Sequence, residues 1–192
     1  MLEEEYQKGH RPVGAQRNLP PLQVPFAYEI RDVAEADLPD IREIYNHYVA
    51  NSTVTFDESP MTLRQLRAKF AQAQKSHLPF IVAVSPGGHV LGYAYVFPWK
   101  AKAAYRFTVE NSIYLGPAAT GKGLGKALMA ELIERSRKAG LKEIVAVIAD
   151  RGAEASIRLH EQFGFREIGH MGRVGFKFDR WLGTVLMQKS LK

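Results

Sequence analysis

The fold of this chain is decided by residues 106–126, which read Arg-Phe-Thr-Val-Glu-Asn-Ser-Ile-Tyr-Leu-Gly-Pro-Ala-Ala-Thr-Gly-Lys-Gly-Leu-Gly-Lys. From Arg106 to Leu115 the side chains alternate between two faces. One face holds Phe107, Val109, Asn111, Ile113 and Leu115, and the other holds Arg106, Thr108, Glu110, Ser112 and Tyr114. This period of two predicts a strand with one polar face. A glycine-rich turn follows, and Leu124, Leu128, Leu132 and Ile133 then recur at helical spacing until Gly140, which predicts a helix with a glycine just past its end.

The glycine turn is suited to binding phosphate. Gly121, Gly123 and Gly125 stand at the start of the predicted helix, where free amides and the positive end of the helix dipole favour a pyrophosphate. The sequence therefore points to a phosphate-bearing cofactor that needs no metal. A tight turn without any ligand would use the same glycines, so this peptide alone leaves both interpretations open.

The same turn nearly matches the nucleotide-binding P-loop. Gly116 to Gly123 follows a strand, opens a helix and has Gly121-Lys122 at the required places. A P-loop needs Ser or Thr as its last residue to hold magnesium, and Gly123 has no hydroxyl. Asp150, after an apolar stretch, could imitate the metal-binding acid, so a kinase stays open as a minor alternative.

The regions on either side of this stretch complete a mixed α/β pattern. Leu38 to Tyr48 has helical periodicity behind a candidate N-cap, Asp37, and Thr62 with Gln65 has capping-box spacing for a second helix. Two β-rich segments, residues 80–84 and 90–97, are joined by a Ser-Pro-Gly-Gly turn and predict a hairpin. Later segments predict a buried strand at residues 144–148, a helix at residues 154–163 and two or three final strands within residues 165–191. This order predicts an α/β sandwich around a mixed sheet rather than a symmetric Rossmann fold.

Length and composition limit the class of protein. The 192 residues suit one domain, which we expect from Phe26 to Lys192 behind a flexible, proline-rich leader at residues 1–25. The absence of a long apolar run and of a basic, apolar N-terminus predicts a cytoplasmic protein with no membrane contact. The net charge of +6 indicates an anionic partner, but the Lys and Arg residues are scattered, which argues against nucleic acid and favours a polyanionic cofactor.

Several separate stretches together resemble the GNAT superfamily of acyl-CoA N-acyltransferases, and within it the phosphinothricin and methionine sulfone or sulfoximine acetyltransferases. The resemblance covers residues 28–191 and lies in residues 44–49, 52–56, 98–101, 104–110, 111–115, 156–165 and 175–177 together with Trp181. It implies a mostly antiparallel sheet that is splayed at its centre and flanked by helices on both faces. It also implies acetyl-CoA as co-substrate, no metal, and a homodimer.

The resemblance assigns the cofactor residues. The main chains of Ile113 and Leu115 pair with pantetheine, the amides of Gly121, Lys122, Gly123, Leu124, Gly125 and Lys126 hold the pyrophosphate, and Ser156 belongs to the same site. The chain departs from the common family pattern at three places. Thr120 replaces Gln or Arg, Ala153 replaces an Asn that contacts pantetheine, and Gly183 replaces an Asp.

The resemblance also assigns the chemistry. An ammonium group cannot attack a thioester, so a base is required, and the family places Glu110 in that role; the strand pattern independently puts Glu110 on the polar face. A surface glutamate would show the same alternation. His160, one turn after Ser156, is expected to transfer a proton at the sulfur or to share the work of the base, although a packing histidine is the alternative.

Three further residues are candidates for binding the acceptor substrate. Arg106 shares the predicted polar face with Glu110 and would bind a carboxylate, while Phe56 and Trp99 would wall the pocket. The expected reaction is direct transfer of acetyl to the α-amine of a small amino-acid-like substrate, because the chain has no cysteine to form an acetyl-enzyme. The alternatives are a protein or peptide N-terminal acetyltransferase and a CoA-binding module without catalysis.

Overall fold

A computed structural model describes residues 26–192, so the predicted leader at residues 1–25 lies outside the described part of the chain. The core of the fold is one seven-stranded sheet in the order β1-β2-β3-β4-β5-β7-β6. Its strands are β1 (Glu29–Asp32), β2 (Phe80–Val84), β3 (Val90–Pro98), β4 (Thr108–Leu115), β5 (Glu143–Ala149), β6 (Arg166–Lys177) and β7 (Arg180–Ser190). Neighbouring strands are antiparallel except for β4 and β5, which are parallel.

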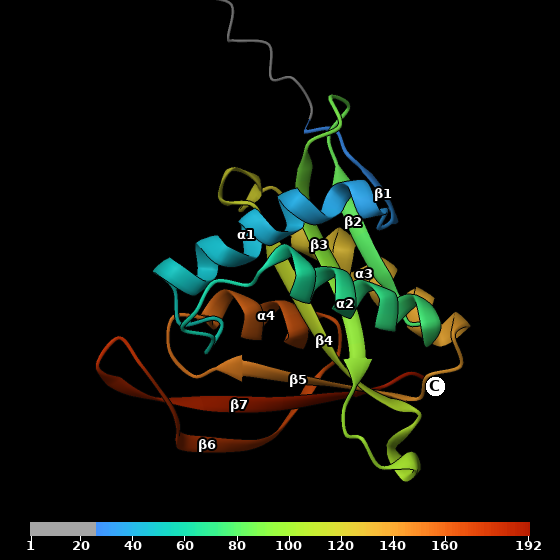
Figure 1. Cartoon of the computed structure of the whole chain (residues 1–192). Coiled ribbons are helices and arrows are strands. Elements are labelled where there is room, and N and C mark those ends of the chain that lie inside the picture. The colour runs from blue at the N-terminus through green and yellow to red at the C-terminus, as the bar shows by residue number, and fades with distance from the viewer. Residues whose placement is uncertain (1–25) are drawn as a thin grey trace, which may run out of the picture.

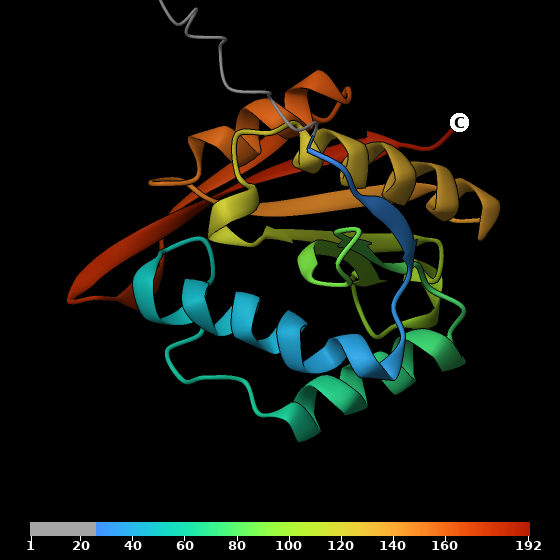
Figure 2. The same cartoon turned by 90° about the horizontal axis from the view of Figure 1, so that it is seen from above.

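Four helices cover both faces of the sheet. Figure 2 shows α1 (Leu38–Asn51) and α2 (Leu63–Lys75) on one side and α3 (Leu124–Lys138) and α4 (Glu154–Gln162) on the other. Each side has its own core. Leu38, Ile41 and Tyr93 belong to the α1/α2 side, and Leu128 and Ile144 to the α3/α4 side. The predicted architecture, a mixed and mostly antiparallel sheet between two helical layers, is therefore confirmed.

Local signals in the sequence were accurate for α2, α3 and the β2–β3 hairpin. Thr62 accepts a hydrogen bond from the amide of Gln65, whose side chain accepts one in return from the amide of Thr62, which completes the predicted capping box. Helix α3 ends at Lys138, and Gly140 has φ of 78°. Only glycine adopts this left-handed conformation without a steric cost, which explains the stop.

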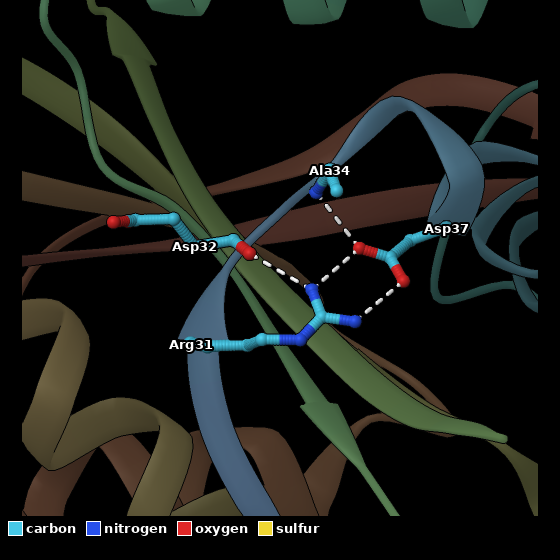
Figure 3. A network of polar contacts seen from close by, with 4 residues as sticks. All are labelled: Arg31, Asp32, Ala34 and Asp37. Atoms are coloured by element: carbon cyan, nitrogen blue, oxygen red, sulfur yellow. Dashed lines mark hydrogen bonds and ion pairs between the residues drawn. The ribbon is translucent and has the colours of Figure 1, made fainter. Parts of the chain in front are cut away.

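Asp37 stands at the N-cap position of α1, as predicted, but the predicted capping of the helix by its carboxylate is wrong. The Asp37 side chain makes no capping hydrogen bond to α1. It accepts two hydrogen bonds from the Arg31 guanidinium, at 2.7 and 2.8 Å, and one from the Ala34 amide at 2.8 Å (Figure 3). These contacts close the short 3-10 turn η1 (Glu35–Asp37) onto β1, and the hydrogen bond with Arg31 is the main reason that the pKa of Asp37 lies below its ordinary value. The carboxylate joins a strand to a helix start, a use that local spacing does not reveal.

The sheet separates between its two parallel strands. Strand β4 pairs with β5 from Thr108 to Glu110 and with no further residue of β5, although β4 continues to Leu115 and β5 to Ala149. On its other edge β4 stays paired with β3 along its length. The edge of β4 from Asn111 onward is thus free of β5, and this separation positions the candidate site.

Candidate active site

A groove of about 470 Å³ opens where β4 and β5 part. Its walls come from β4, β5, the glycine turn before α3 and the first turns of α4, and they include Asn111, Ile113, Leu115, Gly123, Ala149 and Ser156. Hydrogen bonds between β4 and β5 are missing beyond Glu110. A ligand with amide groups can therefore bond to this edge of β4 in place of β5. The groove is long, partly open and lined by both main chain and small side chains, as an extended ligand requires.

The glycine turn forms one end of this groove, and its geometry is suited to phosphate. Gly121 and Gly123 have φ values of 72° and 81°, and a Cβ at either position would meet no atom within 4 Å. The two glycines therefore give the turn its left-handed conformation and leave open space beside the amides at the start of α3. No other residue type combines these properties at low conformational cost.

Most of the predicted cofactor residues line the groove. They are Ile113, Leu115, Gly121, Gly123, Gly125, Lys126 and Ser156. Two do not. The side chain of Leu124 is fully buried in the core, so only its main chain is available to a ligand. The Lys122 ammonium lies over the Phe26 ring, 4.8 Å from its centroid.

Tyr48 of α1 adds a contact that the sequence did not indicate. Its hydroxyl donates a hydrogen bond to the Leu115 carbonyl at 2.6 Å, and Tyr48 itself lines the groove. The contact ties the end of β4 to α1, on the face opposite α3. Helical periodicity marks Tyr48 only as a residue on the buried face, so nothing local separates this role from packing.

Glu110 is the last residue of β4 that pairs with β5, opposite Val145. It is half-buried and lies at the inner end of the separation between the strands. Burial raises the pKa of Glu110 above its ordinary value, and the nearby ammonium groups of Lys100 and Lys69 partly offset that increase. A carboxylate with a raised pKa is a better proton acceptor than an exposed one, which is the property a general base needs.

His160 approaches the same region from the opposite face of β4. Its ring Nδ1 lies 2.8 Å from the Ser156 carbonyl, and its Nε2 lies 2.9 Å from Nδ2 of Asn111. Because a carbonyl can only accept, Nδ1 carries the hydrogen, and Nε2 of the neutral ring accepts from the Asn111 amide. Burial lowers the pKa of His160, with a smaller opposing effect of the hydrogen bond to Ser156. The resting ring is therefore neutral, with its basic nitrogen toward β4.

Glu110 and His160 do not contact each other in the described structure. Consecutive residues of a strand point to opposite faces, so Glu110 faces the α1/α2 side while Asn111 and its partner His160 lie on the α3/α4 side. The two groups flank the separation between β4 and β5 from either side. Asn111 is the residue that sequence reasoning missed here. It is a buried polar residue on an otherwise apolar strand face, and its Oδ1 has no hydrogen-bond partner in the described part of the chain.

The predicted acceptor residues are placed unevenly. Phe56 lies in the loop between α1 and α2 and packs against the α3/α4-side core. The main chain of Trp99 pairs with Thr108 at the start of β4, and the Lys100 ammonium lies 4.4 Å from the centroid of the Trp99 ring. Trp99 therefore adjoins the end of β4 that carries Glu110, whereas Phe56 lies on the α3/α4 side, close to the groove.

Arg106 is not brought to the face of Glu110. Strand β4 begins at Thr108, so Arg106 belongs to the end of the preceding 3-10 turn η2 (Ala103–Tyr105) and not to the strand predicted from alternation. Its guanidinium donates to the Ala103 carbonyl and stacks on the exposed ring of Phe107. The cations that influence Glu110 electrostatically are instead Lys100 and Lys69.

The site lacks the features of a magnesium-dependent kinase. The acid required for that alternative, Asp150, accepts hydrogen bonds from the Gly183 amide and the His170 ring, both at 3.1 Å. Within residues 26–192 no group of three or more His, Cys, Asp and Glu residues is arranged to hold a metal ion. No helix in the same range combines the length and the apolar character needed to cross a membrane.

Gly183 has a specific steric role beside Asp150. A Cβ on Gly183 would collide with the Asp150 carboxylate and with the Met171 carbonyl. The main chains of residues 150 and 183 are also bonded, through the Asp150 amide and the Gly183 carbonyl at 3.0 Å. The Asp150 carboxylate thus occupies the space that a side chain at position 183 would need, which explains why glycine stands there.

The parallel strands β4 and β5 thus part beside a glycine-lined helix start and leave a groove suited to an extended ligand that carries phosphate. Comparisons with known proteins identify the family. The model of the acetyltransferase (GNAT) family matches residues 41–165. The chain belongs to this family, and the prediction of an acyltransferase is confirmed.

Named relatives cover most of the chain. A phosphinothricin N-acetyltransferase of Alcaligenes faecalis is 41% identical, over 86% of this chain and 83% of the relative. An L-methionine sulfoximine/L-methionine sulfone acetyltransferase of Pseudomonas aeruginosa is 44% identical, over 84% of this chain and 94% of the relative. A solved structure of a phosphinothricin acetyltransferase from Sinorhizobium meliloti, in complex with acetyl-CoA, superposes with a TM-score of 0.82 at 41% identity, covering 85% of this chain and 88% of that one.

Proposed function

We propose that this enzyme transfers an acetyl group from acetyl-CoA to the α-amine of a small amino-acid-like substrate, of the phosphinothricin, methionine sulfone or methionine sulfoximine class. The observation that carries the proposal is the position of Glu110, a half-buried carboxylate at the inner end of the groove, where β4 and β5 part. Relatives with 41 and 44% identity act on substrates of this class by name.

The groove fits acetyl-CoA at both ends. The turn at Gly121 and Gly123 offers open space beside helix-start amides, which suits a pyrophosphate. The unpaired edge of β4 at Ile113 and Leu115 suits the amide groups of pantetheine. Lys126 lines the phosphate end and supplies positive charge, and Ser156 lines the opposite wall. Acetyl-CoA supplies the acetyl group as a thioester; all other requirements fall on the residues of the chain.

Glu110 removes the proton that prevents an ammonium group from reacting. A protonated α-amine has no lone pair, so the carboxylate must accept one proton, directly or through a water molecule, before the nitrogen can bond to the acetyl carbon. Transfer is direct, within a complex that holds both substrates. The chain contains no cysteine, so no cysteine nucleophile is present to form an acetyl-enzyme.

His160 acts at the sulfur side. In its neutral form Nε2 has a lone pair and no proton. His160 therefore shares the work of the base by accepting the second proton, which the nitrogen loses after it has bonded to the acetyl carbon, and it gives this proton to the thiolate as the carbon–sulfur bond breaks. The Asn111 amide, which donates to Nε2 of the neutral ring, can turn its oxygen toward that nitrogen once the ring is protonated. The unpartnered Oδ1 of Asn111 is available for this exchange.

The acceptor site adjoins Glu110, where β4 and β5 part. In this proposal Phe56 and Trp99 form apolar walls for the acceptor side chain. Arg106, whose guanidinium donates to the Ala103 carbonyl, is a candidate for binding a distant anionic group of the acceptor rather than one beside Glu110.

We further propose a cytoplasmic homodimer. The β6–β7 hairpin exposes a group of large apolar side chains, each about half accessible to solvent: Ile168, Val174, Phe176, Phe178 and Trp181. An exposed group of this size on a sheet edge is suited to pairing with a second copy. Light scattering would give about twice the chain mass of 21.5 kDa if the proposal holds.

The activity is tested by following thiol release from acetyl-CoA over a panel of amino acids and their analogues. Release that depends on phosphinothricin, methionine sulfone or methionine sulfoximine supports the proposal. Release with peptides but not with free amino acids would instead identify a protein N-terminal acetyltransferase. Acetyl-CoA binding without release for any acceptor would identify a non-catalytic module.

A further inference from the structure

The loop between α1 and α2 connects the two halves of the proposed site. Val54 of this loop lines the groove, and Phe56 packs against the same core that the groove borders. The position of the loop therefore determines both the wall of the cofactor groove and the proposed wall of the acceptor pocket. Residues 52–57 belong to no helix or strand, so their position depends on side-chain contacts.

A buried lysine from the far edge of the sheet holds this loop. Lys177, the last residue of β6, is 2% exposed. Its ammonium donates hydrogen bonds to the carbonyls of Ser52 and Thr55, at 2.8 and 2.9 Å. No carboxylate of the described residues lies within ion-pair distance of Lys177. Within the described part of the chain, both hydrogen bonds of the Lys177 ammonium thus go to the main chain of the loop.

A buried ammonium is a costly way to stabilise a fold. Removal of the charge from water opposes burial, and burial lowers the pKa of Lys177, against a smaller opposite effect of Asp57 and Glu58. An apolar side chain of similar length would fill the same space without that cost. Unlike an apolar side chain, the ammonium makes directional hydrogen bonds, and these fix two carbonyls of one short loop relative to β6.

The same strand also sets the position of the Phe56 ring. A Cβ on Gly175 would collide with two atoms of that ring and crowd a third, so the ring packs directly on the main chain of β6. Gly175 and Lys177 lie on one face of β6, two residues apart. Strand β6 thus holds the loop in two ways. The Lys177 side chain bonds to the main chain of the loop, and the main chain at Gly175 packs against the Phe56 ring.

Other contacts hold the loop from the opposite directions. Thr53 donates to the Arg151 carbonyl at 3.0 Å, and the Tyr45 hydroxyl bonds to Thr55 at 3.0 Å and to Asp57 at 2.5 Å. These contacts come from α1 and from the segment between β5 and α4. Lys177 supplies the hydrogen bonds that come from the β6–β7 hairpin.

We propose that Lys177 is a positioning residue for the acceptor substrate, which fixes residues 52–57 against β6 so that Phe56 stands at the acceptor pocket. Lys177 touches neither substrate and acts through the loop. This inference rests on the proposed function, since it assigns the loop to acceptor binding.

The test compares Lys177→Met with Arg180→Met. Met keeps the length and apolar stem of Lys177 but cannot donate to Ser52 or Thr55. Arg180, which pairs with Lys177 across the hairpin, is exposed, so its replacement removes an equal charge without touching the loop.

In Lys177→Met the KM for the acceptor should rise about tenfold or more, as the loss of two charge-assisted hydrogen bonds implies. The KM for acetyl-CoA should stay within about twofold, because the glycine turn and the β4 edge, which carry the proposed hydrogen bonds to the cofactor, are unchanged and the loop adds only the apolar side chain of Val54 to the groove wall. Arg180→Met should resemble the wild type in both constants.

Gly175→Ala provides a second variant should Lys177→Met fail to fold. It keeps the lysine and displaces the Phe56 ring, and it should raise the acceptor KM in the same direction. Unchanged acceptor KM in both variants, or an equal rise in the KM for acetyl-CoA, would overturn the proposal.

Amide hydrogen exchange separates this inference from the proposed function. Exchange in residues 52–57 should be faster in Lys177→Met than in Arg180→Met, whether or not any acceptor is acetylated. If no acceptor in the panel is acetylated, the proposed function fails and the assignment to acceptor binding fails with it, while faster exchange would still show the loop anchor. If acceptors are acetylated and exchange is unchanged, the proposed function stands and Lys177 is not the anchor.

Discussion

Replacement of Glu110 by Gln is the most direct test of the mechanism. Gln keeps the size of the side chain and its capacity to accept a hydrogen bond, but it cannot take a proton from an ammonium group. Glu110 is half-buried and its pKa is raised, so it supplies a base closer to neutral pH than a surface glutamate would. A positioned general base contributes roughly 10²- to 10⁴-fold. We therefore expect the turnover rate near neutral pH to fall about 10²-fold or more, which corresponds to about 2.7 kcal/mol in the activation free energy.

The size of this loss should depend on pH. The wild type deprotonates bound substrate itself, whereas the variant must wait for free amine, whose fraction rises about tenfold per pH unit below the pKa of the amine. The ratio of wild-type to variant turnover should therefore shrink as pH rises. Thiol release, followed from about pH 6.5 to 9.5, measures both rates across the range in which α-amines titrate.

A control and two outcomes complete the test. Glu161→Gln alters an exposed glutamate of α4 and should leave turnover unchanged. A Glu110→Gln enzyme with full activity would remove Glu110 from the mechanism. A large loss that does not vary with pH would reassign Glu110 to substrate positioning, because a lost binding contact costs the same whatever the protonation of the free amine.

Three further predictions address the groove, the electrostatics and the fold. Gly123→Val should weaken acetyl-CoA binding about tenfold or more, measured by calorimetry, because Gly123 has a φ of 81° and a side chain there would stand in the groove; unchanged affinity would disprove the pyrophosphate site. Lys69→Met removes a positive charge that lowers the pKa of Glu110, so that pKa should rise and the acidic limb of the kcat/KM profile should move to higher pH, whereas Lys75→Met at the exposed end of α2 should not move it. Asp37→Asn should lower the free energy of unfolding by about 1–2 kcal/mol at neutral pH, measured by urea denaturation. Because the pKa of Asp37 is lowered in the folded protein, its contribution is present above the pKa of the unfolded state and is lost as pH falls through the folded value; a difference from wild type that persists in strong acid would contradict this account.

The parts of the fold that sequence predicted best depend on local spacing. The capping box at Thr62 and the helix end at Gly140 involve residues only a few positions apart. The interactions that stabilise them are therefore visible in the local sequence. The alternation of side chains along residues 108–115 also predicted correctly that Glu110 and Asn111 lie on opposite faces of the strand. The same argument failed for Arg106, because the polar residues of an irregular turn can continue the alternation of a strand by chance.

Contacts between distant segments could not be predicted in this way. Asp37 looked like a helix cap because its partner, Arg31, lies in a separate strand whose approach depends on the tertiary fold. Lys177 bonds to a loop more than a hundred residues earlier, and no periodicity relates the two. The buried partner of Asn111 was missed although a signal was present, since a polar residue on an apolar strand face is visible in the sequence and requires a buried partner.

The contact between Asp150 and Gly183 has a consequence for how the enzyme can change over generations. The Asp150 carboxylate occupies the space that any side chain at position 183 would need, and the Met171 carbonyl borders the same space. A larger residue at position 183 would be harmful while Asp150 is present, and it would become acceptable only after position 150 had become smaller and the main chain at Met171 had moved. The effect of either substitution thus depends on the residue at the other position. A lineage that changes position 183 first therefore has to pass through a less stable intermediate, whereas a lineage that changes position 150 first does not meet this clash.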